Sequence, residues 1–343
     1  MLSKPPHISV IIPVFNGGEF LHKCLGAIFG STYTSYEVIV ANDSSTDDSA
    51  EVSREKGAVV ISTERQAGPA AARNLAAQTA RGEILLFIDA DVVVRPDTIA
   101  KVAARFENHP EMSALFGSYD DEPAEQNFLS QYKNLQHHFV HQTSSREAST
   151  FWSGLGAVRR NVFIDMGGFD CKKFAVPSIE DIELGIRLRS AGHRIVLDRD
   201  IQAKHLKKWQ IVSLLRTEIF CRAKPWSKLI IQNQGMINDM NLKTSDRLSA
   251  ILTGLGFGFL PLVFWQPLLL ILIAVFFAII LFLNRDFFRF FVKKKGVRFA
   301  VQAFPWQLLY FFYSGVVFVY YWIRYVVPAT LGFKKREEIN GTG

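Results

Sequence analysis

Cysteine is scarce in this sequence. Its three cysteines, Cys24, Cys171 and Cys221, lie far apart, and none belongs to a Cys-x-x-Cys pair. This spacing argues against both a disulfide framework and a cysteine-based zinc site. The N-terminal residues also lack the apolar core and the small-residue cleavage site of a signal peptide. We therefore expect the polar part of the chain to stay in the cytoplasm.

Charge is missing altogether from one long region. The run Leu248–Leu283 contains 36 residues without a charged side chain, although charged residues make up 21% of the chain. A single straight helix of that length would exceed a hydrocarbon core of about 30 Å. The Gln266-Pro267 pair interrupts the run. We therefore predict two short membrane spans, 248–265 and 267–283.

A third apolar run, 299–327, is rich in Tyr, Trp and Phe. Two spans before it would return the basic segment 285–298 to the cytoplasm, as the positive-inside tendency favours. A third span would then place the tail 331–343, which contains GFKKREE, on the non-cytoplasmic side, and the same tendency disfavours this. The run is therefore a third span, a re-entrant segment or a partly interfacial one, and we expect two to three spans within 247–330.

Basic residues outnumber acidic ones and give the chain a net charge of +7. They are concentrated in the segments 204–228 and 285–298, which both border the apolar runs. This placement favours anionic lipid headgroups over nucleic acid as a partner. Segment 206–246 is accordingly expected to form basic amphipathic helices at the membrane interface.

Strand and helix patterns alternate through the first hundred residues. Short β-branched and apolar runs predict strands, and amphipathic or Ala-rich segments that end in Gly predict helices. The predicted strands are His7–Val14, Tyr36–Asp43, Ala58–Thr63 and Glu83–Asp91, and the predicted helices are Gly17–Gly30, Ser45–Gly57, Gly68–Gly82 and Arg95–Asn108. This alternation is typical of a doubly wound, parallel α/β sheet. Such sheets bind ligands at the carboxyl ends of their strands.

Two carboxylates, Asp89 and Asp91, end the fourth predicted strand. Side chains two residues apart on a strand point to the same side, so both can reach one small volume. A divalent cation would remove their repulsion, because Mg²⁺ typically takes one or two protein carboxylates and completes its shell with water and phosphates. The alternative interpretation is a solvated turn in which Asp91 or Asp97 caps the next helix.

Other polar residues follow the neighbouring strands. Asn42–Asp47 comes after the second strand, where a carboxylate can accept hydrogen bonds from a base or ribose. Ser45 or Thr46 is also expected to cap a helix there. Pro13–Asn16 ends the first strand and offers an aromatic face. Arg73, on the third helix, can pair with a diphosphate or form an ordinary surface salt bridge.

These segments, in this order, resemble the family 2 glycosyltransferases. The resemblance covers about residues 8–205, and its motifs are ISVIIPVFN (Ile8–Asn16), ANDSSTD (Ala41–Asp47), GPAAARN (Gly68–Asn74), DAD (Asp89–Asp91), GGFD (Gly167–Asp170) and ED (Glu180-Asp181). In the second motif, Asn42 and Ser44 replace the family's Asp and Gly. The resemblance implies a GT-A α/β domain over 1–205. The apolar runs predict an all-α transmembrane region over 247–330, followed by a polar tail, 331–343.

The family resemblance also implies a nucleotide-sugar donor, a UDP- or GDP-sugar, and a Mg²⁺ or Mn²⁺ ion. By this resemblance, Pro13, Phe15 and Asp43 would hold the base. Asp89 would face the ribose and belong, with Asp91, to the metal site.

The same resemblance assigns roles beyond the donor. Asp181 would be the general base of an inverting displacement, while the metal and Arg73 would stabilise the departing diphosphate. His205 matches a position that contacts metal or diphosphate in some relatives, although a lone His more often packs or hydrogen bonds. Ser178–Asp181 also looks like a capping box, in which Asp181 could simply cap a helix.

The segment CRAKPW (Cys221–Trp226) is the nearest counterpart of the QxxRW motif of processive relatives, but it lacks the Gln and the spacing. Long-chain polymer synthesis is therefore not expected. Arg222, Lys224 and Trp226, together with Glu180, are weaker candidates for binding an acceptor or its phosphate. The first three can also anchor the chain at lipid headgroups.

These observations predict a membrane-bound inverting glycosyltransferase with a lipid-linked or glycan acceptor at the cytoplasmic face, which is the inner membrane if the chain is bacterial. A sugar hydroxyl acceptor needs Asp181 as a base. A polyprenyl-phosphate acceptor is already ionised near pH 7 and does not. A nucleotidyltransferase and an inactive nucleotide-sugar-binding membrane scaffold are the alternatives of another class.

Overall fold

The computed structural model describes residues 7–232, 239–240 and 242–330. It divides into two compact units, Met1–Trp209 and Gln210–Gly343. The predicted polar tail, 331–343, lies outside the described residues.

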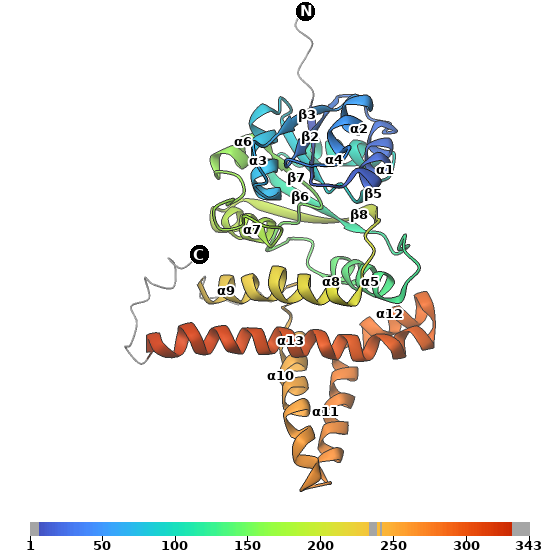
Figure 1. Ribbon diagram of the computed structural model, residues 1–343, viewed down its shortest axis with the longest axis vertical. Coiled ribbons are helices and arrows are strands. Elements are labelled where there is room, and N and C mark those ends of the chain that lie inside the picture. The colour runs from blue at the N-terminus through green and yellow to red at the C-terminus, as the bar shows by residue number, and fades with distance from the viewer. Residues whose placement is uncertain (1–6, 233–238, 241, 331–343) are drawn as a thin grey trace, which may run out of the picture. The chain divides into compact units, whose positions relative to one another are not determined.

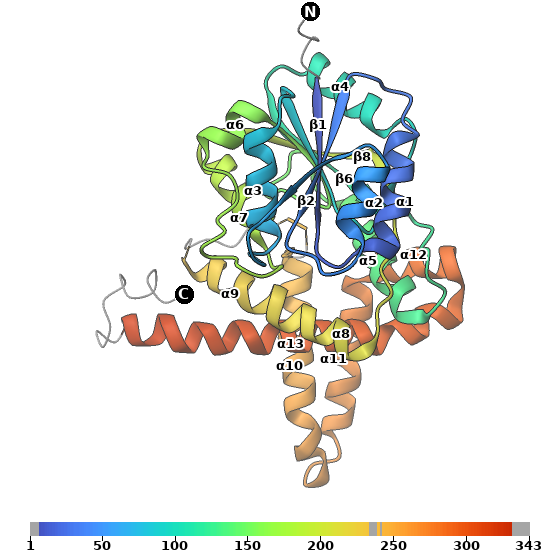
Figure 2. The same ribbon diagram turned by 45° about the horizontal axis from the view of Figure 1, so that its top comes forward.

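The first unit is built on one eight-stranded sheet with the strand order β3-β2-β1-β4-β7-β6-β8-β5 (Figures 1 and 2). Its strands are β1 (Ile8–Val14), β2 (Tyr36–Asn42), β3 (Val59–Ser62), β4 (Ile84–Ile88), β5 (Val92–Val94), β6 (Met112–Tyr119), β7 (Leu155–Arg159) and β8 (Arg194–His205). The first four strands of the order are parallel, as the alternating pattern predicts. β7 runs antiparallel to β4 and β6, and β5 antiparallel to β8, so the sheet as a whole is mixed.

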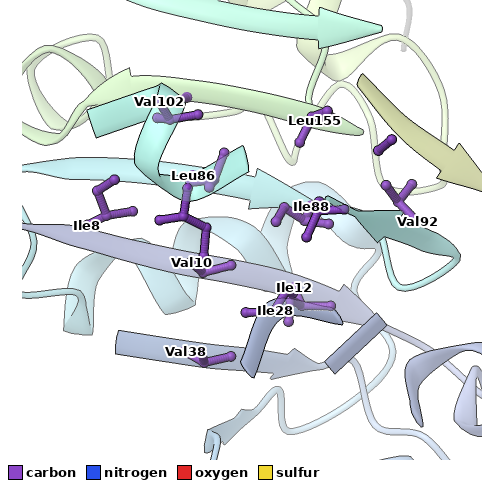
Figure 3. Packing of buried hydrophobic residues seen from close by; sticks show 14 of the residues in the cluster. Ile8, Val10, Ile12, Ile28, Val38, Leu86, Ile88, Val92, Val102 and Leu155 are labelled. Atoms are coloured by element: carbon purple, nitrogen blue, oxygen red, sulfur yellow. The ribbon is translucent and has the colours of Figure 1, made fainter. Parts of the chain in front are cut away.

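Helices connect these strands and cover the sheet. They are α1 (Gly18–Phe29), α2 (Ser49–Glu55), α3 (Pro69–Thr79), α4 (Thr98–Asn108), α5 (Phe128–Thr143), α6 (Arg160–Asp165) and α7 (Glu180–Ser190). Alternate residues of β1 point to one face, where they form a single core with Ile28 of α1 and Val102 of α4 (Figure 3). The residues between them are buried on the other face, so β1 is covered on both sides, as expected of a central strand in a parallel sheet.

The opposite face of the sheet carries an aromatic cluster. Phe87 of β4 packs against Phe163 and Phe169, each with ring centroids 5.3 Å away. All three rings are almost completely buried. They fix the segment after α6 against the end of β4, and this segment leads to α7.

The described residues of the second unit form helices and the short segments between them. Its elements are α8 (Ile211–Arg216), the π-helix η1 (Thr217–Ala223), α9 (Lys224–Gln232), α10 (Thr244–Phe259), the 3₁₀-helix η2 (Leu260–Phe264), α11 (Leu269–Leu283), α12 (Arg285–Lys295) and α13 (Val297–Thr330). The predicted break at Gln266-Pro267 falls between η2 and α11, and α10 and α11 form a hairpin (Figure 1).

In the part of the chain that the structure describes, two helices are long and apolar enough to cross a membrane, Thr244–Phe264 and Val297–Pro328. A third candidate exists only if α11 and α12, which meet at a bend of 71°, count as one span. α11 by itself has 15 residues, fewer than the predicted span 267–283, because its first turn begins at Leu269 after the proline. Two to three apolar segments are therefore present.

Candidate active site

The two carboxylates of the DAD motif lie in a turn between β4 and β5. The predicted strand through Asp91 is too long, because β4 ends at Ile88 and the N–H of Val92 donates to the carbonyl of Asp89 across the turn (3.0 Å). Each carboxylate has its own cationic or imidazole neighbour. Asp89 Oδ1 accepts a hydrogen bond from Arg73 (2.7 Å), and Asp91 Oδ2 lies 3.4 Å from Nε2 of His205. These separate neighbours compensate the two nearby charges.

Arg73 is enclosed by the site rather than exposed at its surface. The guanidinium donates through Nη2 to Asp89 and through Nη1 to Glu180 Oε1 (2.9 Å), and only 4% of the residue is exposed. Its side chain also lies over the ring of Phe169, 5.6 Å from the centroid. The surface salt bridge considered from the sequence is therefore wrong. The helix α3 instead carries a buried cation that joins the DAD turn to the start of α7.

Asp181 is the second residue of α7 and faces the loop before β7. Its Oδ2 accepts hydrogen bonds from the N–H and the hydroxyl of Ser153 (3.0 and 3.3 Å), and its Oδ1 accepts from the N–H of Ile182 (2.8 Å). Burial and the neighbouring charge of Glu180 raise the pKa of Asp181 to about 6, while Ser153 and Arg73 oppose this rise. A carboxyl group with that pKa is a stronger base than an ordinary aspartate.

The predicted capping box at Ser178–Asp181 is wrong. The helix begins at Glu180 with Ile179 as its N-cap residue, and no side chain caps it. Glu180 is instead drawn inward by Arg73, and its Oε2 accepts from the N–H of Ser178 (3.0 Å). Asp181 therefore faces Ser153 with Oδ2, while its Oδ1 accepts from the N–H of its neighbour Ile182.

Two residues that support this site, Asn74 and Arg187, were not predicted as site residues from the sequence. Asn74 donates to the carbonyl of Phe169 (2.7 Å) and accepts from its N–H (2.9 Å). Arg187 binds Glu183 through two hydrogen bonds and also donates to the carbonyls of Met166 and Gly168. Both therefore fasten the GGFD segment, and the ARN motif that contains Asn74 was the available signal.

His205 is the last residue of β8 and is held on several sides. It pairs with Val92 in the antiparallel ladder, and the N–H of the next residue, Leu206, donates to the carbonyl of Asp91 (2.9 Å). The ring of Tyr119 stacks on its imidazole with centroids 4.2 Å apart and planes at 10°. Burial alone would raise the pKa of Asp91, but His205 and Lys207 lower it below its ordinary value.

The pair of Asp91 and His205 fits a divalent ion that is held only partly by the protein. The carboxylate of Asp91 and the imidazole of His205 are 3.4 Å apart, close enough to bind the same ion. Their side chains are 24% and 10% exposed. Within residues 7–330 as described, no group of three or more His, Cys, Asp or Glu side chains is arranged to hold a metal. Mn²⁺ and Mg²⁺ tolerate such a two-residue site when substrate phosphates complete it. Asp89, predicted as a further ligand, is bound to Arg73 instead.

The predicted base-binding residues lie at the ends of β1 and β2. Asp43 is buried, and its carboxylate accepts from the hydroxyl of Thr63 (2.9 Å) and from the N–H groups of Ala67 and Gly68 (both 2.8 Å). A carboxylate has about four acceptor positions, so one remains for a ligand. Phe15, two residues after Pro13, is 45% exposed and offers an open aromatic face. The N–H of Asp43 donates to the carbonyl of Val14, the residue before Phe15 (2.8 Å).

The ANDSSTD segment leaves β2 after Asn42 and continues as a loop to Asp48, and the predicted cap by Ser45 or Thr46 is wrong. The N-cap residue of α2 is Asp48, and Thr46 instead donates to the side chain of Asn16 (2.8 Å). Ser44 has a φ of 57°, a conformation that favours glycine. This explains why the family motif has Gly there, and in this chain a hydrogen bond from the Ser44 hydroxyl to the carbonyl of Thr63 (2.8 Å) accompanies the strained conformation.

The remaining candidates, Arg222, Lys224 and Trp226, belong to the second unit. Arg222 donates to Glu218 Oε1 (2.7 Å) within the π-helix η1, and Glu218 is 5% exposed. The positive charge of Arg222 is therefore shared with a buried carboxylate, which reduces its attraction for a phosphate. Lys224 begins α9, which also contains Trp226.

Comparison with known proteins gives a family for the first unit. Residues 9–167 match the model of glycosyl transferase family 2. The chain carries a family 2 glycosyltransferase domain. It is 28% identical over 126 residues to the glycosyltransferase GlyG of Streptococcus pneumoniae (35% of this chain, 42% of that protein). It is 38% identical over 98 residues to the glycosyltransferase AglE of Haloferax volcanii (26% of this chain, 32% of that protein). Each alignment thus spans less than half of the relative's own length.

Two solved structures share the fold of this family 2 domain. One is the mannosyltransferase PcManGT of Pyrobaculum calidifontis in complex with GDP-Man and Mn²⁺, with a TM-score of 0.55, 16% identity, and coverage of 92% of this chain and 88% of that one. The other is S. aureus TarS 1–349 in complex with UDP-GlcNAc, with a TM-score of 0.52, 17% identity, and coverage of 92% and 91%. The predicted GT-A fold is therefore confirmed.

Proposed function

We propose that this chain is a membrane-attached inverting glycosyltransferase that moves a sugar from a UDP- or GDP-sugar to a hydroxyl of a lipid-linked or glycan acceptor. The observation that carries the proposal is Asp181, a partly buried carboxylate with a pKa of about 6, linked through Glu180 and Arg73 to the DAD turn. The family 2 domain supports a nucleotide sugar as the donor.

In the proposed reaction, the acceptor hydroxyl loses its proton to Asp181 as its oxygen attacks the anomeric carbon. The new carbon–oxygen bond forms while the bond from the anomeric carbon to the phosphate oxygen breaks, and the electron pair leaves with the nucleoside diphosphate. Ser153 donates two hydrogen bonds to Oδ2 of Asp181, so the rotation of this carboxylate is restricted before the acceptor arrives. A fixed base of raised pKa contributes about 10²–10⁴-fold to such a step.

The donor would lie between the ends of β1, β2 and the DAD turn. Phe15 and Pro13 would contact the base, and Asp43 would accept from it through its remaining position. Asp89 would face the ribose while it holds Arg73. Asp91 and His205 would hold a Mg²⁺ or Mn²⁺ ion, which when bound would neutralise charge on the leaving diphosphate.

We place the acceptor at the cytoplasmic side of a membrane. The support is the pair of long apolar helices and the basic segments around them. Glu180 has both carboxylate oxygens engaged and is therefore proposed as a structural neighbour of Asp181. Arg222, Lys224 and Trp226 are proposed as contacts to lipid headgroups rather than to the sugar.

The test is a screen of UDP- and GDP-sugars with Mn²⁺ or Mg²⁺ and membrane lipid extracts, with products identified by mass spectrometry. Formation of nucleoside diphosphate and a glycosylated lipid is expected. Asp181→Asn should strongly reduce transfer to a hydroxyl. The exposed carboxylate Asp165 provides the control Asp165→Asn, which should leave transfer unchanged. Full activity of Asp181→Asn would instead identify a phosphate acceptor, and release of pyrophosphate would contradict glycosyl transfer.

A further inference from the structure

We infer that α13 lies along the membrane surface, and that only the α10–α11 hairpin enters the bilayer, so that the chain enters and leaves on the same side. This inference rests on the membrane attachment proposed above. The length and composition of α13 allow a span. The contacts that the middle of α13 makes within the second unit argue against a membrane-spanning helix.

The middle of α13 is bound to a charged cluster. Tyr313, halfway along the 34-residue helix, donates its hydroxyl hydrogen bond to Oε2 of Glu218 (3.0 Å). The other oxygen of this buried carboxylate pairs with Arg222 (2.7 Å). A membrane-spanning α13 would place both charged side chains near the bilayer centre, where charged groups are most costly. An interfacial α13 leaves them at the depth of the headgroups.

A second contact repeats the pattern two turns further on. Nζ of Lys228, on α9, lies 5.7 Å from the centroid of the Tyr321 ring. Charged residues of η1 and α9 therefore accompany α13 through its middle and C-terminal half, rather than only at one end. Because α9 is itself amphipathic and carries Lys224 and Lys228, the pair of helices resembles a layer at the headgroups more than a transmembrane pair.

Aromatic composition agrees with this placement. Trp and Tyr prefer the membrane–water interface, and a spanning helix concentrates them near its two ends. In α13 they occur from the first third to the end, at Trp306, Tyr310, Tyr313, Tyr320, Tyr321, Trp322 and Tyr325. An interfacial helix keeps all of them at one depth.

The α10–α11 hairpin has the opposite character. It contains no charged residue between Leu248 and Leu283, and its tip residues Phe264 and Trp265 are 87% and 74% exposed. α13 crosses the open end of this hairpin in both views of the second unit (Figures 1 and 2). If the hairpin lies along the bilayer normal, α13 therefore runs near the membrane plane. The basic residues of α12 then lie on the same side of the membrane as α13, as the positive-inside tendency favours.

The test measures depth along α13 in the full chain. The exposed residues Val301, Val316 and Ile323 lie within about 60° of one another around the helix, since each residue turns about 100°. Each would be replaced by Cys in a background with Cys171→Ala and Cys221→Ala, spin-labelled, and placed in vesicles of phosphatidylethanolamine and phosphatidylglycerol. Ile271→Cys on α11, also exposed, is the matched control for a hairpin position. Accessibility to oxygen and to a water-soluble nickel reagent reports the depth of each label.

The expected result is one shallow depth for labels at 301, 316 and 323, and a deeper label at 271. A spanning α13 would move the label by about 22 Å between residues 301 and 316, and a maximum depth at 316 would overturn the inference. If the label at 271 is in water as well, membrane attachment itself fails and the inference falls with it. Glycosyl transfer is measured separately, so its absence does not mimic either outcome.

Discussion

Arg73 joins Asp89 and Glu180, which lie 91 residues apart in the chain, with contacts of 2.7 and 2.9 Å from its two terminal nitrogens. The cation therefore sits between the turn that would face the donor and the helix that carries the proposed base. The negative charges of Asp89, Glu180 and Asp181 raise the pKa of Arg73 against the effect of its burial, so it stays charged.

Replacement of Arg73 by Met should destabilise the first unit strongly. The substitution leaves Glu180 buried without its partner, and a broken buried pair costs about 3–5 kcal/mol. Chemical denaturation in detergent measures the change in the free energy of unfolding. Lys101→Met is the control, because it removes an exposed ion pair with Asp97 on α4 and should cost about 0.5 kcal/mol or less. Equal effects of the two substitutions would show that the Arg73 pair is not structural.

Replacement of Asp181 by Asn should reduce transfer to a hydroxyl acceptor by about 10²–10⁴-fold. The fold should survive, because the amide oxygen can still accept from Ser153. The folded-state pKa of about 6 lies above the ordinary 3.8, so protonation favours the native state and this contribution is lost as the pH rises through 6. At pH 8 the variant should therefore melt no lower than the parent. A lower melting temperature would assign the lost activity to unfolding.

Replacement of Glu180 by Gln should move the acid limb of the pH–rate profile. Asp181 must be ionised to accept a proton, so kcat/KM should fall below pH 6 in the parent. Loss of the Glu180 charge lowers the pKa of Asp181, and the fall should then occur at a lower pH. Glu183→Gln is the control, because Glu183 pairs with Arg187 on the same helix. If the acid limb is unchanged in Glu180→Gln, the charge of Glu180 does not influence the titration of Asp181.

Replacement of Tyr119 by Leu should weaken Mn²⁺ binding by about tenfold, the lower end of the effect of residues that orient a metal ligand. The stacked ring of Tyr119 fixes the imidazole of His205. Titration of Mn²⁺ by electron paramagnetic resonance, with UDP or GDP present, measures this without turnover. Tyr119→Phe keeps the ring and should bind Mn²⁺ as the parent does. If Tyr119→Leu binds Mn²⁺ as tightly as the parent, the ring of Tyr119 does not orient the metal ligand His205.

Replacement of Gly68 by Ala should disturb the loop held by Asp43. Gly68 has a φ of 88°, and a Cβ there would lie 2.3 Å from the carbonyl oxygen of Ala175. The N–H that Gly68 donates to Asp43 should therefore be displaced. Nucleotide binding, followed by the fluorescence of a labelled UDP or GDP, should weaken. Gly57→Ala also has a positive φ but open space around it, so it should leave nucleotide binding unchanged.

The fold of the first unit could be predicted from the sequence to a large extent. The buried runs of β1 and β4 and the helices between them follow from local periodicity. The exact end of β4 could not be predicted, because the residues Asp89–Asp91 are compatible both with the end of a strand and with a turn. The antiparallel β7 was also missed, because strand direction depends on pairing partners far along the chain.

The sequence by itself determined the class of chemistry. Its ordered motifs identify the family 2 domain, and the uncharged run Leu248–Leu283 determines where apolar helices form, because residue type and spacing act locally. Only the tertiary structure decided the partners of the charges. Arg73 faces Glu180 and Asp91 faces His205, since folding brings together residues more than a hundred positions apart and a buried charge is stable only beside a partner.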